Sequence, residues 1–395
     1  MMPGYRSRSG ASYRGVAAAL AANGTALPVI VLSLIGLVAA VLPTFLRIAP
    51  NRLLTGEAFN PHMWPLAGGW LLVMATAILP LPGRRWFLVA LACLAVIGLP
   101  LLAGAEARQI LARASPYTRV QLGAGFWLAW LAGALLLLDR LRAMSKAVQA
   151  GVWLAIASLL VAAAMAGQFD GLALVREWQA QRAPFATATV EHLRLAAVTL
   201  LLALLVGAPL GWWVWRTRRG DGVLVGVLAF LQTVPSLALF ALLIAPFAWL
   251  AHAWPALGGL GFGGTGAAPA VFALLLYALL PVVRYTIAGL DAVPADAREA
   301  ARGLGMSRGQ LLWRVQLPLG WPVLLAGLRI VAVQTIGLAA VAALIGAGGL
   351  GRFVFLGIGQ GAMDMVLLGT LAIIVLALAS DLLFQGLLAL TERRA

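Results

Sequence analysis

The sequence predicts an all-α, polytopic membrane protein with about ten transmembrane helices, and three observations lead to this fold class. Of the 395 residues, 63% are hydrophobic and 10% are charged, whereas soluble domains carry about 25% charged residues. The mean hydropathy is +0.98. The uncharged residues form runs of about 20, the length of helix that crosses about 30 Å of hydrocarbon. The composition therefore excludes a water-soluble enzyme.

The uncharged runs give the order of the predicted spans. They lie near residues 27–46, 64–82, 86–104, 121–138, 147–167, 195–215, 222–250, 268–289, 321–345 and 365–390. A polar segment at 168–192 separates the first five spans from the last five. We therefore expect an accessory N-terminal bundle over 1–180 and a second bundle over 181–395, each of about five helices.

The distribution of basic residues predicts the orientation. The net charge is +15, and Lys and Arg cluster in alternate loops, at 84–85, 140–146, 216–219 and 298–314. Cytoplasmic loops of membrane proteins carry this excess, so the charge indicates topology and not nucleic-acid binding. We expect a multi-pass protein of a bacterial inner membrane with both termini in the cytoplasm, although the loop at 105–120 fits this orientation least well.

The seventh span contains a predicted helix break. Pro235 lacks a backbone donor and breaks or kinks a helix, and Gln232, Thr233 and Ser236 place polar atoms beside it. Broken helices are tolerated in membranes where they line a cavity. We predict that these four residues line a translocation path. The alternative is a kinked helix whose polar groups pack against its neighbours.

The inside loop at 290–320 has the sequence of a two-helix hairpin. Pro294 is suited to start a short helix, with Asp296 in its favourable first turn. Gly303 or Gly305 is suited to end it.

A second short helix is predicted to follow directly. Ser307 is an N-cap residue for a helix over 308–316, and Pro318 is expected to stop that helix. The hairpin would present small residues to a neighbouring surface, as a docking element does. The alternative is an ordinary amphipathic loop helix.

A motif in this loop resembles the EAA loop of permease subunits of bacterial ABC importers. The spacing is E-A-A, three residues, G, nine residues, then [I/V]-x-L-P, with Val where Ile is usual. The matching residues are Glu299, Ala300, Ala301, Gly305, Val315, Leu317 and Pro318. The resemblance implies a type I importer fold, with the hairpin as the coupling helix that docks on a separate cytoplasmic ATPase subunit.

Three further segments are similar to permeases of the osmoprotectant group, which take up glycine betaine, choline or carnitine. They are residues 231–239, 279–286 and 347–351. The resemblance covers about 185–392, and the additional first five spans look like a long form of that group. Methionine and other amino-acid importers share the EAA loop and are the nearest alternative.

The same resemblance implies the partners. A periplasmic binding protein would deliver the solute, two permease copies would pair around one path, and ATP and Mg would bind to the ATPase. No cofactor is expected in this chain. The only lysine, Lys146, does not lie in the G-K-[ST] sequence of a P-loop, so ATP would have to be hydrolysed by a partner.

Other chemistry finds little support in the sequence. The glycine clusters at 261–266 and 346–351 fit G-x-G-x-x-G, but between membrane helices we expect turns or close packing there. The single cysteine, Cys93, allows no intramolecular disulfide. We assign no metal site to the scattered histidines, no catalytic residue, and no convergent polar set of a membrane-embedded enzyme.

Two charged residues lie deep in the last two spans. Arg329 is about 12 Å and Asp381 about 15 Å from the predicted inner ends of their helices, so we predict that they form a buried charge pair. The alternative for Arg329 is snorkelling to the headgroups. An ion-coupled secondary transporter, the main rival class, would need paired acidic residues in both halves, and Asp381 is the clear candidate in the spans.

Overall fold

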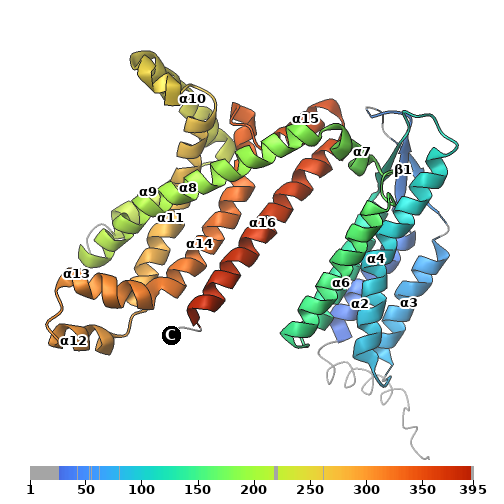
Figure 1. Ribbon diagram of the computed structural model, residues 1–395, viewed down its shortest axis with the longest axis horizontal. Coiled ribbons are helices and arrows are strands. Elements are labelled where there is room, and N and C mark those ends of the chain that lie inside the picture. Colours follow the sequence, from blue (N-terminus) through green and yellow to red (C-terminus); the bar gives the residue numbers. More distant parts are fainter. Residues whose placement is uncertain are drawn as a thin grey trace, which may run out of the picture. The chain divides into compact units, whose positions relative to one another are not determined.

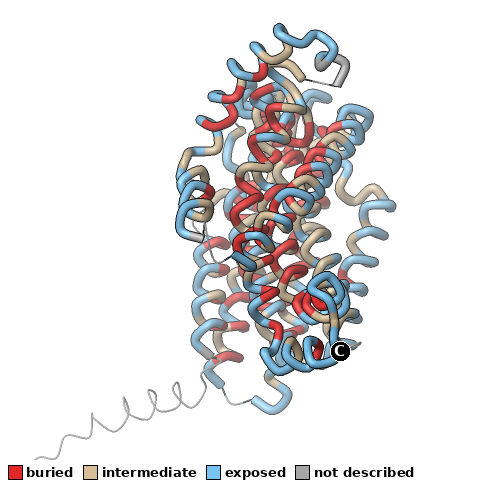
Figure 2. Tube along the Cα trace, turned by 90° about the vertical axis from the view of Figure 1, so that its left-hand side faces the viewer, coloured by how far each residue is buried: buried red, intermediate tan, exposed pale blue. Residues whose placement is uncertain are grey.

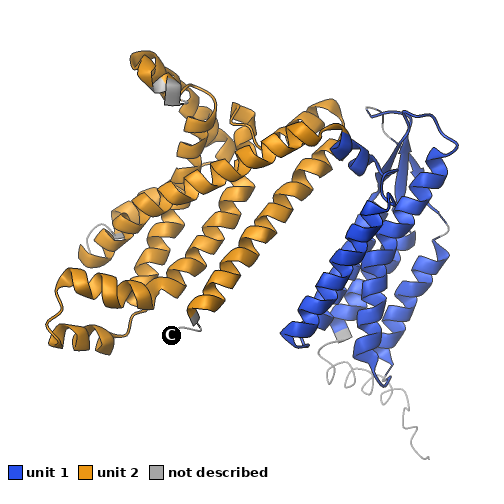
Figure 3. Cartoon of the chain, viewed as in Figure 1, with its two compact units in different colours: residues 1–179 blue, residues 180–395 orange. Residues whose placement is uncertain are grey.

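The computed structural model describes residues 26–41, 43–52, 54, 56–61, 63–79, 81–217, 221–260 and 262–392. The chain divides into two compact units, Met1–Gln179 and Ala180–Ala395 (Figure 1, Figure 3). Arg218 and Arg219 of the basic cluster at 216–219 lie outside the described residues, as do His62 and Gly261.

Unit 1 is a helical bundle with a small sheet. Its helices are α2 (Ala26–Val41), α3 (Trp64–Ile78), α4 (Arg84–Leu111), α5 (Ala124–Leu141) and α6 (Lys146–Met165), followed by the short α7 (Ala173–Ala180). The first five correspond to the first five predicted spans. Their core holds Trp70, Leu88 and Leu136, all buried, so the helices pack through apolar side chains.

A three-stranded antiparallel sheet in unit 1 is an addition to the predicted all-helical fold. Its strands are β1 (Leu46–Ala49), β2 (Glu57–Phe59) and β3 (Arg119–Leu122), in the order β2-β1-β3. Leu46 pairs with both Phe59 and Leu122 and is fully buried. Strands of three or four residues are too short to show an alternating pattern, which is why the sequence did not reveal them.

The segment 168–192, predicted as a polar connector, is folded into the two units: its first half belongs to unit 1, and Arg182 onward belongs to α8 of unit 2. Glu177 of α7 is buried and pairs with Arg52, with 2.8 Å between Oε1 and Nη2. Arg176 donates to the carbonyls of Pro116 and Thr118, both at 2.9 Å. These polar residues therefore fasten α7 to the loops around the sheet.

Unit 2 is a second helical bundle built around α11 (Ala267–Asp291), which contacts α8, α9, α10 and α14. The other helices are α8 (Arg182–Thr217), α9 (Asp221–Thr233), α10 (Ser236–Ala253), α12 (Ala295–Gly303), α13 (Arg308–Leu311), α14 (Leu317–Ala339), α15 (Gly351–Gln360) and α16 (Met363–Glu392). A π-helical turn, Leu312–Gln316, joins α13 to α14, and two 3-10 turns cover Pro255–Leu260 and Val341–Ile345. Buried positions, red in Figure 2, follow the helices in both units.

Eight helices in the described parts of the chain are long and apolar enough to cross a membrane. They are α4, α5, α6, α8, α10, α11, the continuous helix Arg308–Ala339 and α16. Three further apolar helices are shorter, at Leu27–Val41, Trp64–Ile78 and Gly222–Thr233. The chain is thus a multi-span membrane protein, and the number of about ten spans stays a prediction.

Candidate functional site: the hairpin and the core cavity

The loop after α11 folds as a two-helix hairpin, whose first helix, α12, is followed by a left-handed turn at Gly305. The amide of Met306 donates to the Ala301 carbonyl at 3.2 Å, and that of Gly305 donates to Arg302 at 2.9 Å. This pair of bonds is the Schellman motif, which needs a left-handed residue at the position after the cap. Gly305 supplies it with a φ of +76°, so the turn at Gly305 terminates α12, whose last helical residue is Gly303.

The second arm of the hairpin begins with a capping box. The Ser307 hydroxyl accepts from the Gln310 amide at 3.3 Å, and the Gln310 side chain accepts from the Ser307 amide at 2.8 Å. Both bonds satisfy amides that have no partner inside the helix. The predicted N-cap residue, Ser307, and Gln310 three residues later therefore cap each other's backbone amides.

The prediction that Pro318 stops this second helix is wrong. Residues 308–339 form one continuous helix, in which Pro318 lies in the first turn of α14. Just before it the chain makes a π turn, and the Leu317 amide donates to the Leu312 carbonyl five residues back. A proline is tolerated in a first turn, and the widened turn before it lets the helix continue.

The hairpin exposes two large apolar side chains that the sequence analysis did not single out. Leu304 is 79% exposed and Trp313 is 72% exposed, and both lie within the EAA-like segment. Glu299 and Ala300 are also exposed, whereas Ala301 is buried. Val315 and Leu317 are half-buried, and Pro318 is exposed. The hairpin thus presents a mixed surface with apolar anchors.

The base of the hairpin is tied closely to the core, because α11 and α14 cross there at two glycines. A Cβ at Gly320 would lie 2.5 Å from the Gly289 carbonyl oxygen, so the backbones are in direct contact. Beside this crossing, the Trp215 indole of α8 donates to Asp291 Oδ1 at 2.8 Å. A displacement of the hairpin would therefore move these three helices.

The seventh predicted span is broken in the structure at Val234 and Pro235, between α9 and α10. The Tyr277 hydroxyl of α11 donates to the carbonyl of Val234 at 2.5 Å. In return, the Gln232 amide donates to the Tyr277 carbonyl at 2.7 Å. That carbonyl lies four residues before Pro281, which has no N–H to offer it. At each of the two proline sites, a side chain from the other helix therefore donates a hydrogen bond to a backbone carbonyl.

The four predicted path residues occupy different surroundings. Gln232 lines a cavity of about 370 Å³ between α9, α11 and α14. Thr233 is exposed and bonds back to its own helix, at the Phe230 carbonyl. Pro235 is exposed at the break and Ser236 is half-buried at the start of α10. The role of these four residues in a path stays a prediction.

The cavity beside Gln232 is lined mainly by one face of α11. Pro281, Arg284, Tyr285 and Ala288 follow the three- and four-residue spacing of a helix face. Leu280, Gln232 and Gln334 complete the lining. The sequence analysis missed Arg284 and Gln334 as cavity residues. An arginine inside an apolar span was the available signal, because intramembrane charges mark functional sites.

The structure brings Arg329 and Asp381 together as a two-pronged ion pair between α14 and α16. Arg329 Nε lies 2.5 Å from Asp381 Oδ1, and Arg329 Nη2 lies 3.0 Å from Oδ2. Gln385 donates a third bond to Asp381 Oδ2 at 2.7 Å. The two side chains remain 35% and 27% exposed on the isolated chain, so the pair lies at the side of the bundle and not at its centre.

The glycine cluster at 346–351 packs against α8. Gly348 has a φ of +81°, and a Cβ there would lie 2.3 Å from Glu191 Oε2. The Gly349 amide donates to the same oxygen at 2.9 Å. The cluster follows the 3-10 turn Val341–Ile345 and not a strand, which a dinucleotide-binding unit would require.

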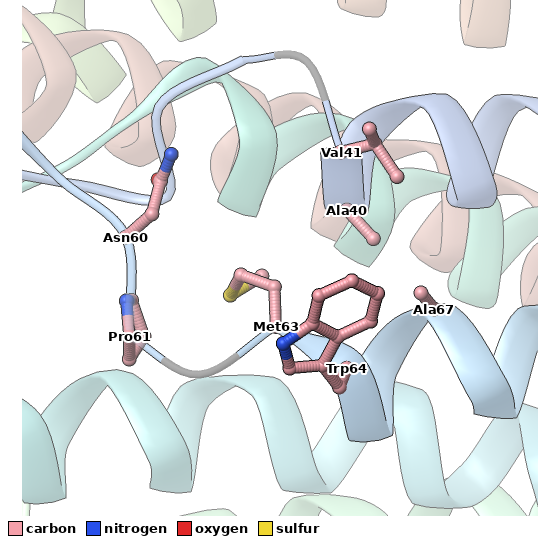
Figure 4. Close-up of a pocket in the computed structure, with 7 residues that line it drawn as sticks. All are labelled: Ala40, Val41, Asn60, Pro61, Met63, Trp64 and Ala67. Carbon is pink, nitrogen blue, oxygen red and sulfur yellow. The ribbon is translucent and has the colours of Figure 1, made fainter.

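A second cavity, of about 420 Å³, lies in unit 1 between the end of α2 and the start of α3. Figure 4 shows Met63 and Trp64 across the opening from Ala40 and Val41. The polar groups of its lining side chains are the indole N–H of Trp64 and the amide of Asn60, whose Oδ1 already accepts from the Phe45 amide at 2.7 Å. This cavity presents apolar surface and, in its described lining, no charged group.

Comparison with known proteins agrees with this division into units. Residues 200–395 match the family described as binding-protein-dependent transport system inner membrane component. Residues 25–175 match ABC transporter permease YehY, N-terminal domain.

Two relatives and a solved structure are each similar to about half of this chain. The osmoprotectant import permease protein OsmW of Salmonella typhimurium is 40% identical over 202 residues, which are 51% of this chain and 89% of that protein. The choline transport system permease protein OpuBB of Bacillus subtilis is 34% identical over 52% of this chain and 86% of that protein. An inward-facing structure of the MetNI methionine ABC transporter aligns at 22% identity with a TM-score of 0.46, over 53% of this chain and 97% of that chain.

The membrane-spanning helices and the matches to the family model and to the two relatives define the class of protein, a multi-span membrane permease. The chain belongs to the family of inner membrane components of binding-protein-dependent transport systems. Its first five helices form the additional unit that matches the YehY N-terminal domain.

Proposed function

We propose that this chain is the permease subunit of an ABC importer for a small osmoprotectant, such as glycine betaine, choline or a related quaternary amine. The observation that carries this proposal is the 40% identity to OsmW over 202 residues, which covers 89% of that protein. A periplasmic binding protein would deliver the solute, and a second permease copy would complete the path.

The hairpin would couple this permease to its ATPase on the cytoplasmic side, with both chain termini on that side. The exposed Trp313 side chain is a suitable anchor, because tryptophan is enriched among the residues that dominate the binding energy of interfaces, and the exposed Leu304 would add apolar contact area. Movement of the ATPase would then pass through the Gly289–Gly320 crossing into α11 and α14. ATP and Mg would be bound by the ATPase, and this chain would supply binding and movement without catalysis.

Reconstituted transport tests the proposal. The permease is placed in proteoliposomes with its ATPase and binding protein, and the uptake of radiolabelled glycine betaine, choline and methionine is measured. We expect ATP-dependent uptake of a quaternary amine and none of methionine. Uptake that ionophores abolish, and that proceeds without ATP, would instead indicate a secondary transporter. An ATPase variant that cannot hydrolyse ATP is the control.

A further inference from the structure

Arg284 is a charged residue inside a predicted membrane span, and no acidic side chain among the described residues pairs with it. It lies seven residues before Asp291, about 10 Å from that end of α11, and it is exposed on the isolated chain. Among the described residues, no hydrogen bond or ion pair involves Arg284. Arginine stays charged at every physiological pH, so an unpaired guanidinium at this depth is costly.

Besides Arg284, the lining of the cavity contains other side chains that can donate hydrogen bonds. Gln334 and Tyr285 lie with Arg284 in the lining, and the side chain of each carries a hydrogen-bond donor. Tyr285 is held in place because its ring packs against Gly327, where a Cβ would lie 2.2 Å from Tyr285 Cγ. Among the described residues that line the cavity there is no carboxylate. The site is therefore complementary to an anionic group.

The size of the cavity suits a small solute. Its volume of about 370 Å³ falls in the range of roughly 300–1,000 Å³ that is usual for small-molecule sites. The apolar Leu280, Pro281 and Ala288 share the lining with the polar groups. A molecule with a carboxylate at one end and methyl groups at the other would match both parts.

We propose that this cavity is a solute site of the permease and that Arg284 binds the carboxylate of the transported molecule. Arginine holds a carboxylate through two parallel hydrogen bonds, whereas it repels a cation. The permease itself then favours zwitterionic betaines over cationic amines such as choline. This inference rests on the proposed function above and names the solute within that class.

The first test measures the charge preference of the cavity without any solute. Ala288 is exposed and lies one helical turn from Arg284 in the lining, so Ala288→Cys in a Cys93→Ala background places a single thiol there. In the purified complex, the thiol is treated with the anionic 2-sulfonatoethyl and the cationic 2-trimethylammonioethyl methanethiosulfonates. The ratio of the two rates cancels any change in the reactivity of the thiol itself.

The expected result is a ratio that favours the anionic reagent and falls about tenfold when Arg284→Gln is added. Arg216→Gln is the matched control, because Arg216 stacks over Trp212 at 5.3 Å and does not line the cavity. An unreactive thiol, or a ratio that Arg284→Gln leaves unchanged, would overturn the inference.

The second test measures selectivity in the reconstituted importer. We expect Arg284→Gln to lower glycine betaine uptake about tenfold relative to choline uptake, and Arg284→Lys to recover part of the difference. Equal losses for both solutes, at normal abundance, would make Arg284 a structural residue and overturn the inference. A wild-type importer that carries neither solute would overturn the proposed function, while the thiol ratio would still decide the charge preference of the cavity.

Discussion

At the scale of the residue, Gly305 determines the shape of the hairpin through its backbone conformation. A Cβ at this position would have no neighbour within 4 Å, so close packing inside the chain is not the reason for glycine. The reason is the φ of +76°, which costs an L-residue about 1–2 kcal/mol. We expect Gly305→Leu to reach the membrane but to lose most of its solute uptake, measured beside membrane abundance.

The substitution Gly305→Asn separates two causes of that loss, the strained backbone conformation and the bulk of the leucine side chain. Asparagine tolerates the left-handed conformation, so it should retain more uptake than leucine does. Gly309→Ala is the control within the same hairpin, because Gly309 has open space and no positive φ. Normal uptake by Gly305→Leu at normal abundance would refute the coupling role of this turn.

The Arg329–Asp381 pair makes a second prediction at this scale. Asp381→Asn leaves the guanidinium of Arg329 without its charged partner, and removing one member of a pair is more damaging than removing both. We therefore expect Asp381→Asn to lower the melting temperature in detergent by a few degrees, and Arg329→Gln/Asp381→Asn to recover much of the loss. The full double-mutant cycle isolates the interaction between the two side chains. Additive single effects would show that the pair contributes nothing as a pair.

At the scale of the element, the contact of α11 with α14 depends on two facing glycines. Gly320→Ala would put a methyl group 2.5 Å from the Gly289 carbonyl oxygen and push the helices apart at the base of the hairpin. Overpacking of this kind costs about 1–3 kcal/mol. We expect a lower melting temperature and weaker ATPase binding, measured by co-purification.

The matched control lies in the same helix. Gly337 of α14 is exposed, and a Cβ there would meet nothing within 4 Å. Gly337→Ala should therefore leave stability and ATPase binding unchanged. If the two variants behaved alike, the glycine crossing would have no special part in coupling.

The break between α9 and α10 illustrates which part of an element can be predicted. Pro235 and its polar neighbours indicated the break, because a missing backbone donor is visible in the sequence. The partner that satisfies the break was not visible. Tyr277 lies 42 residues after Pro235, and the pairing of its hydroxyl with the Val234 carbonyl arises only when α11 packs against the break.

At the scale of the whole molecule, the two units have separate hydrophobic cores. We propose that unit 1 is accessory, because the hairpin and the Arg284 cavity both belong to unit 2. A chain that starts near residue 180 should then insert, bind the ATPase and keep part of its transport. Co-purification and uptake are the measurements.

The truncation needs a control for membrane insertion. Removal of five helices reverses the side from which the chain enters the membrane, so the shortened chain requires a leader that starts in the cytoplasm. Complete loss of ATPase binding in a chain that is shown to be inserted would count against an accessory role for unit 1.

The sequence by itself determined the features that depend on local chemistry. Apolar runs specified the helices, because lipid requires every backbone group to be satisfied within its own segment. The cap at Ser307 and the turn at Gly305 follow from neighbours along the chain, and the EAA-like spacing placed the hairpin between two spans. The ion pair could be anticipated, because two isolated charges at similar depth in consecutive spans favour pairing.

The tertiary structure alone decided the features that depend on distant residues meeting. The three-stranded sheet needs strands that lie up to about 70 residues apart, and each is too short to be recognised singly. The continuation of the helix through Pro318 depends on a π turn that no local propensity indicates. The Arg284 cavity exists because α9, α11 and α14 pack side by side, and only that packing turns an arginine in an apolar span into the lining of a site.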